Sequence, residues 1–238
     1  MEEIVIKDFQ ELHQAFKRYR DDKRWIFRGH SNPEWKLLPK IGRDLYAGVD
    51  EKMVFESWKR AAVEFISTMP NSDWEWLAIA QHHGLATRLL DWTTNPLNAC
   101  YFSVREPHLN DAIVYAGKFR KNVDYKPMNP MEIDFLAVFR PQRVVPRITR
   151  QGGIFTVHPN PTIELMNGSE GVAALHKIII KKEYRETLLS ELSYYGINSA
   201  TLFPDLDGLS MFINWTIEKK EYWKYPSSVI RPTDRPFG

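Results

Sequence analysis

The feature that most constrains the fold of this chain is a change in the period of its apolar residues. In the first and last parts of the chain, apolar residues recur at the spacing of an α-helix. The stretch between those parts carries short apolar runs that are typical of β-strands. We therefore expect an α+β fold, a single domain over residues 1–238 in which helices pack on a central mixed or antiparallel sheet.

Capping and turn residues give approximate boundaries for these elements. Asn95 followed by Pro96 is typical of a helix start, and Gly84 and Gly196 are typical of helix ends. The predicted helices cover 9–19, 51–68, 73–83, 96–104, 185–195 and 209–219. The predicted strands cover 24–27, 112–116, 135–139, 154–157 and 175–180. We expect 226–238, which contains three prolines, to form a tail outside the domain core.

Composition places the chain among ordinary globular proteins, with 43% hydrophobic and 26% charged residues. A formal net charge of +2 is too small to indicate nucleic-acid binding by itself, although a local basic patch is compatible with it. The single cysteine, Cys100, excludes an intramolecular disulfide and suits a reducing compartment. With no basic leader and no apolar run of membrane-spanning length, we expect a cytoplasmic protein without a membrane partner.

Aromatic residues are abundant, at 13% of the chain, and eight of them are tryptophans. Several tryptophans stand beside charged residues, namely Trp25, Trp35, Trp74, Trp76 and Trp92. Most of these are expected to be core anchors whose indole N–H finds a partner. The alternative is that they form the walls of a cleft for a planar ligand.

The segment 25–35 contains the first candidate site. A predicted strand ends at Phe27 and is followed directly by Arg28, Gly29 and His30. The end of this strand therefore carries a permanent positive charge, that of Arg28. Glycine permits a positive φ and a close approach of a ligand to the backbone. The guanidinium offers planar donors for a phosphate, a carboxylate or a vicinal diol. An ion pair between Arg28 and a buried acid such as Asp91 is an equally acceptable interpretation.

The segment 81–92 contains the second candidate site. His82 and His83 close a predicted helix, and either could cap it, orient a ligand or transfer a proton. Adjacent histidines with one distant cysteine do not supply the four ligands of a zinc site, so no metal is expected. Further polar candidates follow in the chain: Thr87, Arg88, Asp91 and Thr93.

Carboxylates raise a further possibility. Asp91, Asp205 and Asp207 would support a metal-dependent nuclease if they converged on one cation. A cap before the last helix is the favoured role for the latter two. The sequence lacks a Walker A loop and the motifs Gly-x-Gly-x-x-Gly, Gly-x-Ser-x-Gly and His-Glu-x-x-His, which removes the commonest nucleotide-binding, hydrolase and zinc-protease classes.

These motifs resemble those of the FRG domain, named for a (Phe/Tyr)-Arg-Gly motif. The resemblance lies in Ile26-Phe-Arg-Gly-His-Ser31, in Gln81-His-His-Gly-Leu-Ala-Thr-Arg-Leu-Leu-Asp-Trp-Thr93, in Gln151-Gly-Gly-Ile-Phe-Thr156 and in Thr201-Leu-Phe-Pro-Asp-Leu-Asp-Gly-Leu209. It covers about residues 20–215, nearly the whole chain. Members of this family resemble accessory or effector parts of bacterial and phage defence systems, so the resemblance implies a toxin or an antiviral effector.

A second resemblance is to ADP-ribosyltransferases. In those enzymes an early strand with Arg-Gly contacts NAD, a Ser/Thr-rich strand and a helix with Phe follow, and a late strand supplies a catalytic Glu. Here 27–29 resembles the first element, and Thr93-Thr94 with the helix after it resembles the second. The third departs from the pattern, because Gln151 stands where a Glu would be expected. An amide cannot stabilise an oxocarbenium-like centre as a carboxylate does.

The resemblance implies that NAD or a related nucleotide is the substrate and that a macromolecule is the acceptor. Arg28 would hold a ribose or phosphate, His82 or His83 would orient the ligand, and Gln151 would face the reacting centre. Thr87 and Arg88 would line the pocket, and Asp91 would fix one of the two arginines. The missing Glu favours an alternative, a non-catalytic sensing or interaction module that uses the same cleft for a protein or a nucleotide.

Overall fold

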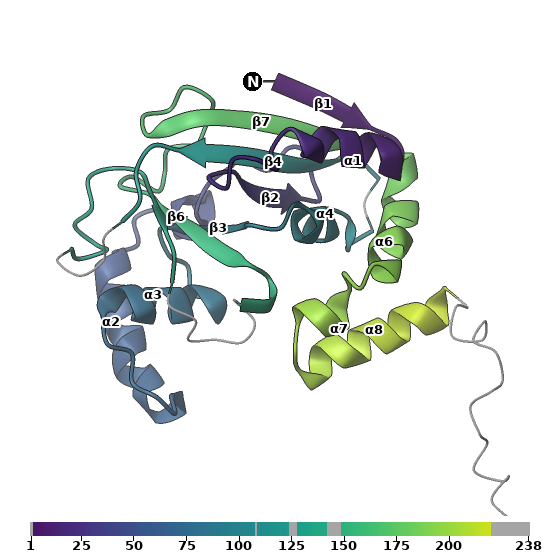
Figure 1. Cartoon of the computed structure of the whole chain (residues 1–238). Coiled ribbons are helices and arrows are strands. Elements are labelled where there is room, and N and C mark those ends of the chain that lie inside the picture. Colours follow the sequence, from purple (N-terminus) through teal and green to yellow (C-terminus); the bar gives the residue numbers. More distant parts are fainter. Residues whose placement is uncertain (1, 108, 124–127, 142–148, 220–238) are drawn as a thin grey trace, which may run out of the picture.

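The computed structural model describes residues 2–107, 109–123, 128–141 and 149–219. Within these residues seven strands form one mixed sheet in the order β1-β7-β4-β2-β3-β6-β5 (Figure 1). The strands are β1 Glu2–Ile6, β2 Ile26–His30, β3 Leu89–Thr93, β4 Ala112–Phe119, β5 Ala137–Phe139, β6 Gly153–Val157 and β7 Val172–Ile180. The expected α+β class and the mixed sheet are confirmed, since β1 runs parallel to β7 and the other neighbours pair antiparallel.

The helices lie close to the predicted positions. They are α1 Phe9–Lys17, α2 Glu51–Ala62, α3 Asp73–His82, α4 Pro96–Val104, α6 Arg185–Tyr194, α7 Ser199–Leu202 and α8 Leu206–Glu218. Side-chain caps explain several starts: Asp8, Ser72 and Asn95 each accept a hydrogen bond from a backbone N–H of the first turn. The last helix begins three residues earlier than predicted, because Asp205 is its cap.

The expectation that strands occupy only the middle of the chain was wrong. The sheet also takes β1, β2 and β3 from the first part, between the early helices. Two of these, β1 and β3, were not predicted, because each is only five residues long and β3 follows a helix after a short turn. The predicted strand at 24–27 is in fact Ile26–His30, so the Arg-Gly-His motif lies inside a strand. The proline-containing segment 226–238 lies outside the described residues.

Two groups of helices cover separate parts of one face of the sheet. Helices α1, α4 and α6 pack with apolar residues of β4 and β7, whereas α2 and α3 pack over β3, β5 and β6. Figure 1 shows the two groups at opposite ends of the sheet, with α7 and α8 beyond α6. The other face is closed by loop residues such as Leu37 and Leu165. The two groups meet over the central strands, since α4 packs on β2 and the α2–α3 group packs over part of β3.

Most of the tryptophans are core anchors, as expected. Trp74 donates its indole N–H to the carbonyl oxygen of Met128, and Trp92 donates to Thr156 Oγ1. Trp35 differs, with 51% of its surface exposed. Among the described helices, none combines the length and the apolar content that a bilayer span requires.

Helix α4 packs directly on β2, and Gly29 makes this contact possible. A Cβ at Gly29 would lie 2.1 Å from the carbonyl oxygen of Ala99 and 2.7 Å from the backbone nitrogen of Ser103. Gly29 does not adopt a positive φ, so that part of the expectation was wrong, whereas close approach of a ligand to its backbone stays a prediction. Its role is to admit a helix backbone, which fixes α4 over the strand that carries Arg28.

We predict that Gly29→Ala lowers the free energy of unfolding by about 3 kcal/mol, because the new methyl group would meet backbone atoms that cannot move alone. Chemical denaturation followed by circular dichroism measures this. Gly48→Ala is the matched control. It has a φ of +78° but no atom within 4 Å of the new Cβ, and it should cost about 1 kcal/mol. Equal losses in the two variants would contradict the packing argument.

Candidate functional site: a cavity between two separating strands

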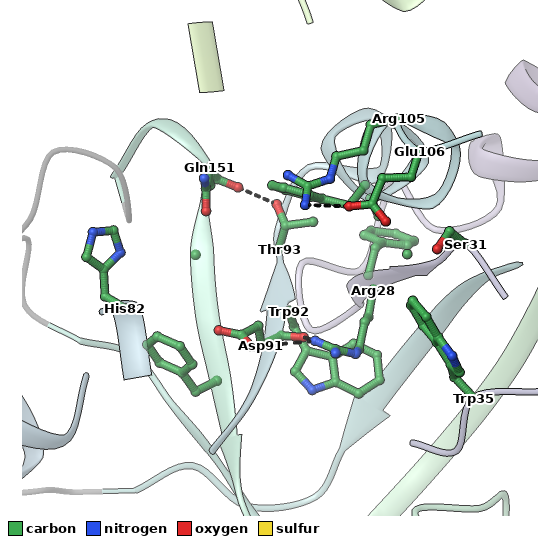
Figure 2. A pocket seen from close by; sticks show the side chains of 16 residues that line it. Arg28, Ser31, Trp35, His82, Asp91, Trp92, Thr93, Arg105, Glu106 and Gln151 are labelled. Atoms are coloured by element: carbon green, nitrogen blue, oxygen red, sulfur yellow. Dashed lines mark hydrogen bonds and ion pairs between the residues drawn. The ribbon is translucent and has the colours of Figure 1, made fainter. Parts of the chain in front are cut away.

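The two motifs meet in the centre of the sheet. β2 pairs with β3 at a single register, Phe27 opposite Thr93, and β3 continues along β6, where Asp91 lies opposite Phe155. A cavity of about 350 Å³ opens over these three strands, beside α4. This volume lies within the range of small-molecule sites. Of the predicted site residues, the cavity is lined by Arg28, Gly29, His82, Asp91, Thr93 and Gln151 (Figure 2).

Arg28 occupies the place where β2 and β3 separate. Its Nη1 donates to the backbone oxygen of Asp91 at 2.6 Å, an acceptor that a continuous ladder would have paired with β2. Its Nε donates to His30 Nε2 at 3.1 Å. The carboxylate of Asp91 is 3.7 Å from Nη1, and only 17% of the Arg28 side chain is exposed. The guanidinium is thus held rigidly, and within the described residues no hydrogen bond uses its Nη2.

The environment of Arg28 combines burial with incomplete neutralisation. Burial lowers the pKa of the guanidinium from its ordinary value, and the charge of Asp91 partly opposes this. Asp91 is more than half exposed, and its Oδ2 also accepts from Gln81 Nε2 at 2.8 Å. The sequence left open an ion pair between Arg28 and a buried acid such as Asp91, and this prediction is correct in part. The pair exists, but the acid is not buried and it does not close the cavity.

Two neutral histidines lie near Arg28. His30 accepts a hydrogen bond from Arg28, and burial together with the charge of Arg28 lowers the pKa of His30 to about 3. The same causes lower the pKa of His158 to about 3. Since Thr156 Oγ1 accepts from the Trp92 indole, its own proton is available for His158 Nε2 at 3.0 Å. His30 was predicted as a ligand-binding residue, but it supports Arg28 instead, and His158 was not predicted.

His82 and His83 take different positions. His82 lies at the end of α3 and lines the cavity, and Figure 2 shows it on the opposite side of Asp91 from Arg28. His83 is the C-cap residue of the helix, and its side chain is exposed. The two rings contact each other, with their centroids 4.9 Å apart. Only His82 is therefore placed to meet a ligand in this cavity.

Gln151 reaches the cavity from the segment that precedes β6. Its backbone oxygen accepts from Thr93 Oγ1 at 2.6 Å and from Asn98 Nδ2 at 3.0 Å. Its side-chain Nε2 donates to the carbonyl oxygen of Leu202 at 3.2 Å. These bonds fix Gln151 between β3, α4 and α7.

Besides His30 and His83, four more predicted residues do not line the cavity. Thr87 is buried and donates to Gln81 Oε1, so it acts on Asp91 only through Gln81. Arg88 pairs with Glu51 at 2.8 Å, because it precedes β3 and turns toward α2. Asp205 caps α8 by accepting from Gly208 N, and Asp207 is exposed in the first turn of that helix.

The arrangement that a metal-dependent nuclease requires is absent from the described residues. No three His, Cys, Asp or Glu side chains in the described ranges are grouped so that they could hold a metal ion. Asp205 and Asp207 belong to α8 and do not join Asp91 in the cavity. The nuclease interpretation is therefore not supported by the placement of these carboxylates.

Sequence reasoning missed the far wall of the cavity. Arg105 and Glu106 follow the end of α4, lie 3.0 Å apart as an ion pair and line the cavity. Arg185, with 5% of its surface exposed, donates to the carbonyl oxygens of Ser31, Glu106 and Asn110. It thereby ties two segments of the cavity wall to α6. A charged pair at a helix end looks like ordinary solvated surface in a sequence, so no pattern could have identified it.

The structure is that of an α+β protein with a cavity at the centre of its sheet, lined by the Arg28–Asp91 and Arg105–Glu106 pairs. Residues 23–112 match the family model of the FRG domain, so this part of the chain, which carries both motifs, is similar to that family. The match runs from just before β2 to the start of β4, so it contains Arg28, Asp91 and the Arg105–Glu106 pair but neither Gln151 nor α8. Neither a curated protein nor a solved structure matches the chain.

We predict that acid destabilises the protein through the two buried histidines. An unfolded histidine binds a proton near pH 6.5, whereas His30 and His158 resist protonation until about pH 3. Stability from these groups is therefore complete above pH 6.5 and is lost as the pH falls toward 3. Between pH 7 and pH 5 each histidine should lower the free energy of unfolding by about 2 kcal/mol.

Urea denaturation at a series of pH values measures this dependence. His158→Gln should remove about half of the decrease between pH 7 and pH 5, whatever its stability at pH 7. The exposed His13, changed to Gln, is the matched control and should leave the decrease as it is. An unchanged slope in His158→Gln would show that His158 is not held neutral.

Proposed function

We propose that the cavity binds a nucleotide, with NAD as the ligand to test first. The observation that carries this proposal is Arg28, a guanidinium that is largely removed from water and only partly neutralised within an open cavity. A buried cation without full pairing is costly. A phosphate or a ribose hydroxyl pair at Nη2 would complete its hydrogen bonds and offset this cost.

The aromatic residues beside Arg28 suit the planar part of such a ligand. Trp35 lines the cavity and is half exposed, and Figure 2 shows it next to Arg28. Its ring also contacts His30, with centroids 6.0 Å apart, which limits its movement. An exposed ring held in this way offers a stacking surface at little entropic cost. We propose Trp35 as the wall for a planar ligand, whereas most of the other tryptophans are core anchors.

The proposed reaction follows the resemblance to ADP-ribosyltransferases. The bond between nicotinamide and ribose would break, nicotinamide would leave, and a nucleophile of a macromolecular acceptor would take the ribose carbon. Gln151 would face this carbon, and His82 would orient the ligand. The carboxylates that line the cavity are Asp91 and Glu106, and each has a cationic neighbour. From the family resemblance, we propose that this activity serves a toxin or an antiviral effector.

A second candidate is a non-catalytic sensing module that binds the same nucleotide or a protein segment. The observation that favours it is the position of Gln151. An amide stands where a catalytic carboxylate is expected, and its Nε2 is engaged with the Leu202 carbonyl oxygen. Such a residue can orient a ligand, but it cannot stabilise a developing positive charge as a carboxylate does.

Replacement of Arg28 tests the binding proposal. We predict that Arg28→Gln weakens NAD binding at least tenfold in isothermal titration calorimetry, because charge-assisted hydrogen bonds are lost (about 1.5–3 kcal/mol). Trp35→Ala should weaken binding by a similar amount through lost stacking and should leave the fold intact. Arg24→Gln is the matched control, since Arg24 is an exposed arginine close by in the chain. Unchanged affinity in Arg28→Gln and Trp35→Ala would overturn the proposal, and unfolding of Arg28→Gln alone would assign Arg28 a structural role.

Release of nicotinamide separates the two candidate functions. We predict that the purified protein with NAD and a cell lysate, as the source of the acceptor, releases nicotinamide and that Trp35→Ala reduces the rate at least fivefold. Chromatography of the small-molecule products measures this. If wild-type protein binds NAD but releases no nicotinamide with or without lysate, the sensing module is the correct function.

A further inference from the structure

A second cavity adjoins the first. It measures about 240 Å³ and lies between the end of α4 and the helices α6, α7 and α8. Arg105 and Glu106 line both cavities, so the two cavities meet at this ion pair. A ligand long enough to pass these two exposed side chains would occupy both cavities. Apart from Tyr101, Arg105 and Glu106, the residues that line the second cavity lie beyond the family match.

The second cavity has apolar walls and an unsatisfied donor. Its walls include Leu189, Ile197 and Phe212. Trp215 also lines it, and the Trp215 Nε1 atom is buried without a hydrogen-bond partner in the described part of the chain. A buried donor without an acceptor costs free energy, and most native donors avoid this. A cavity that combines apolar side chains with the unused N–H of Trp215 suits a planar heterocycle that carries a ring nitrogen as acceptor.

The Arg105–Glu106 ion pair lies at the junction between the cavities, and it provides a guanidinium there. The guanidinium carbon of Arg105 lies 5.7 Å from the centroid of the Phe102 ring and 5.7 Å from that of Phe203. These two rings and Glu106 fix its position. Figure 2 shows Arg105 and Glu106 on the side of the first cavity opposite Asp91. An anionic link that passed from one cavity to the other would run beside this guanidinium.

We propose that the second cavity is a subsite for the second ring of a dinucleotide, with the pyrophosphate beside Arg105. In NAD the nicotinamide half would lie with Arg28, and the adenine would accept a hydrogen bond from Trp215 Nε1. The carboxylate of Glu106 is placed to accept from ribose hydroxyls, as acidic residues do in other nucleotide sites. This inference rests on the nucleotide-binding function proposed above. It adds the part of the site that would favour a dinucleotide over a mononucleotide.

Calorimetry with three probes tests the subsite: NAD, nicotinamide mononucleotide and AMP. We expect wild-type protein to bind NAD at least tenfold more tightly than either mononucleotide, since NAD alone fills both cavities. Trp215→Phe keeps the apolar ring and removes the N–H. We expect it to weaken NAD and AMP about five- to tenfold and to leave nicotinamide mononucleotide within twofold. Trp58→Phe, on α2, is the matched control and should change none of the three.

Each other outcome has a definite meaning. Equal affinity for NAD and nicotinamide mononucleotide in wild-type protein would overturn the subsite and leave the Arg28 site standing. Equal weakening of all three probes in Trp215→Phe would assign Trp215 to the stability of α8, and the thermal unfolding midpoint would then fall as well. Failure of all three probes to bind would overturn both the proposed function and the subsite.

Discussion

The site depends on the separation of β2 from β3 after a single paired register. Continuous pairing there would satisfy the Asp91 carbonyl with a strand amide and would leave no room for a side chain. The guanidinium of Arg28 takes that hydrogen bond instead and enters the gap between the strands. His30 Nε2 accepts a hydrogen bond from Arg28 Nε, and the Asp91 carbonyl oxygen accepts one from Nη1. Among the described residues Nη2 has no partner, so we propose that it meets the ligand. Arg28 therefore replaces a hydrogen bond of the sheet and also lines the cavity.

The remaining structure keeps this gap open. Gly29 lets α4 approach β2 within backbone contact, and Arg185 fixes the loops that carry Ser31 and Glu106. Helix α2 covers the other end of the same sheet face, and α3 reaches the cavity only with its C-terminal residues Gln81 and His82. The cavity is the uncovered centre between two packed groups. The neutral histidines contribute in another way, since a protonated imidazole beside Arg28 would place two cations together in a desolvated site.

Much of this arrangement could be predicted from the sequence because it rests on local patterns. Side-chain caps and glycines set most helix boundaries, and apolar runs identified most of the long strands. The motif residues Arg28, Asp91 and Thr93 were expected to share a site, and they do. β3 was missed because five residues with one exposed Asp do not show a clear period. Thr87 and Arg88 were expected in the pocket but lie outside its lining, because a buried hydrogen bond or an ion pair and a ligand contact use the same residue types. The favoured cap role of Asp205 is confirmed. His158 lies near Arg28 and Arg185 bonds to Ser31 and Glu106 only because the fold brings distant parts of the chain together, so local sequence patterns did not identify them.

The central claim is that Arg28 presents an unsatisfied cation to a ligand in an open cavity, and a crystal structure of the protein grown with NAD tests it most directly. The account predicts ligand density over β2 and β3, with a phosphate or ribose oxygen within hydrogen-bond distance of the Arg28 guanidinium and one ring against Trp35. Density elsewhere on the protein with an empty cavity, or a cavity closed by Trp35 over an Arg28–Asp91 ion pair, would contradict it.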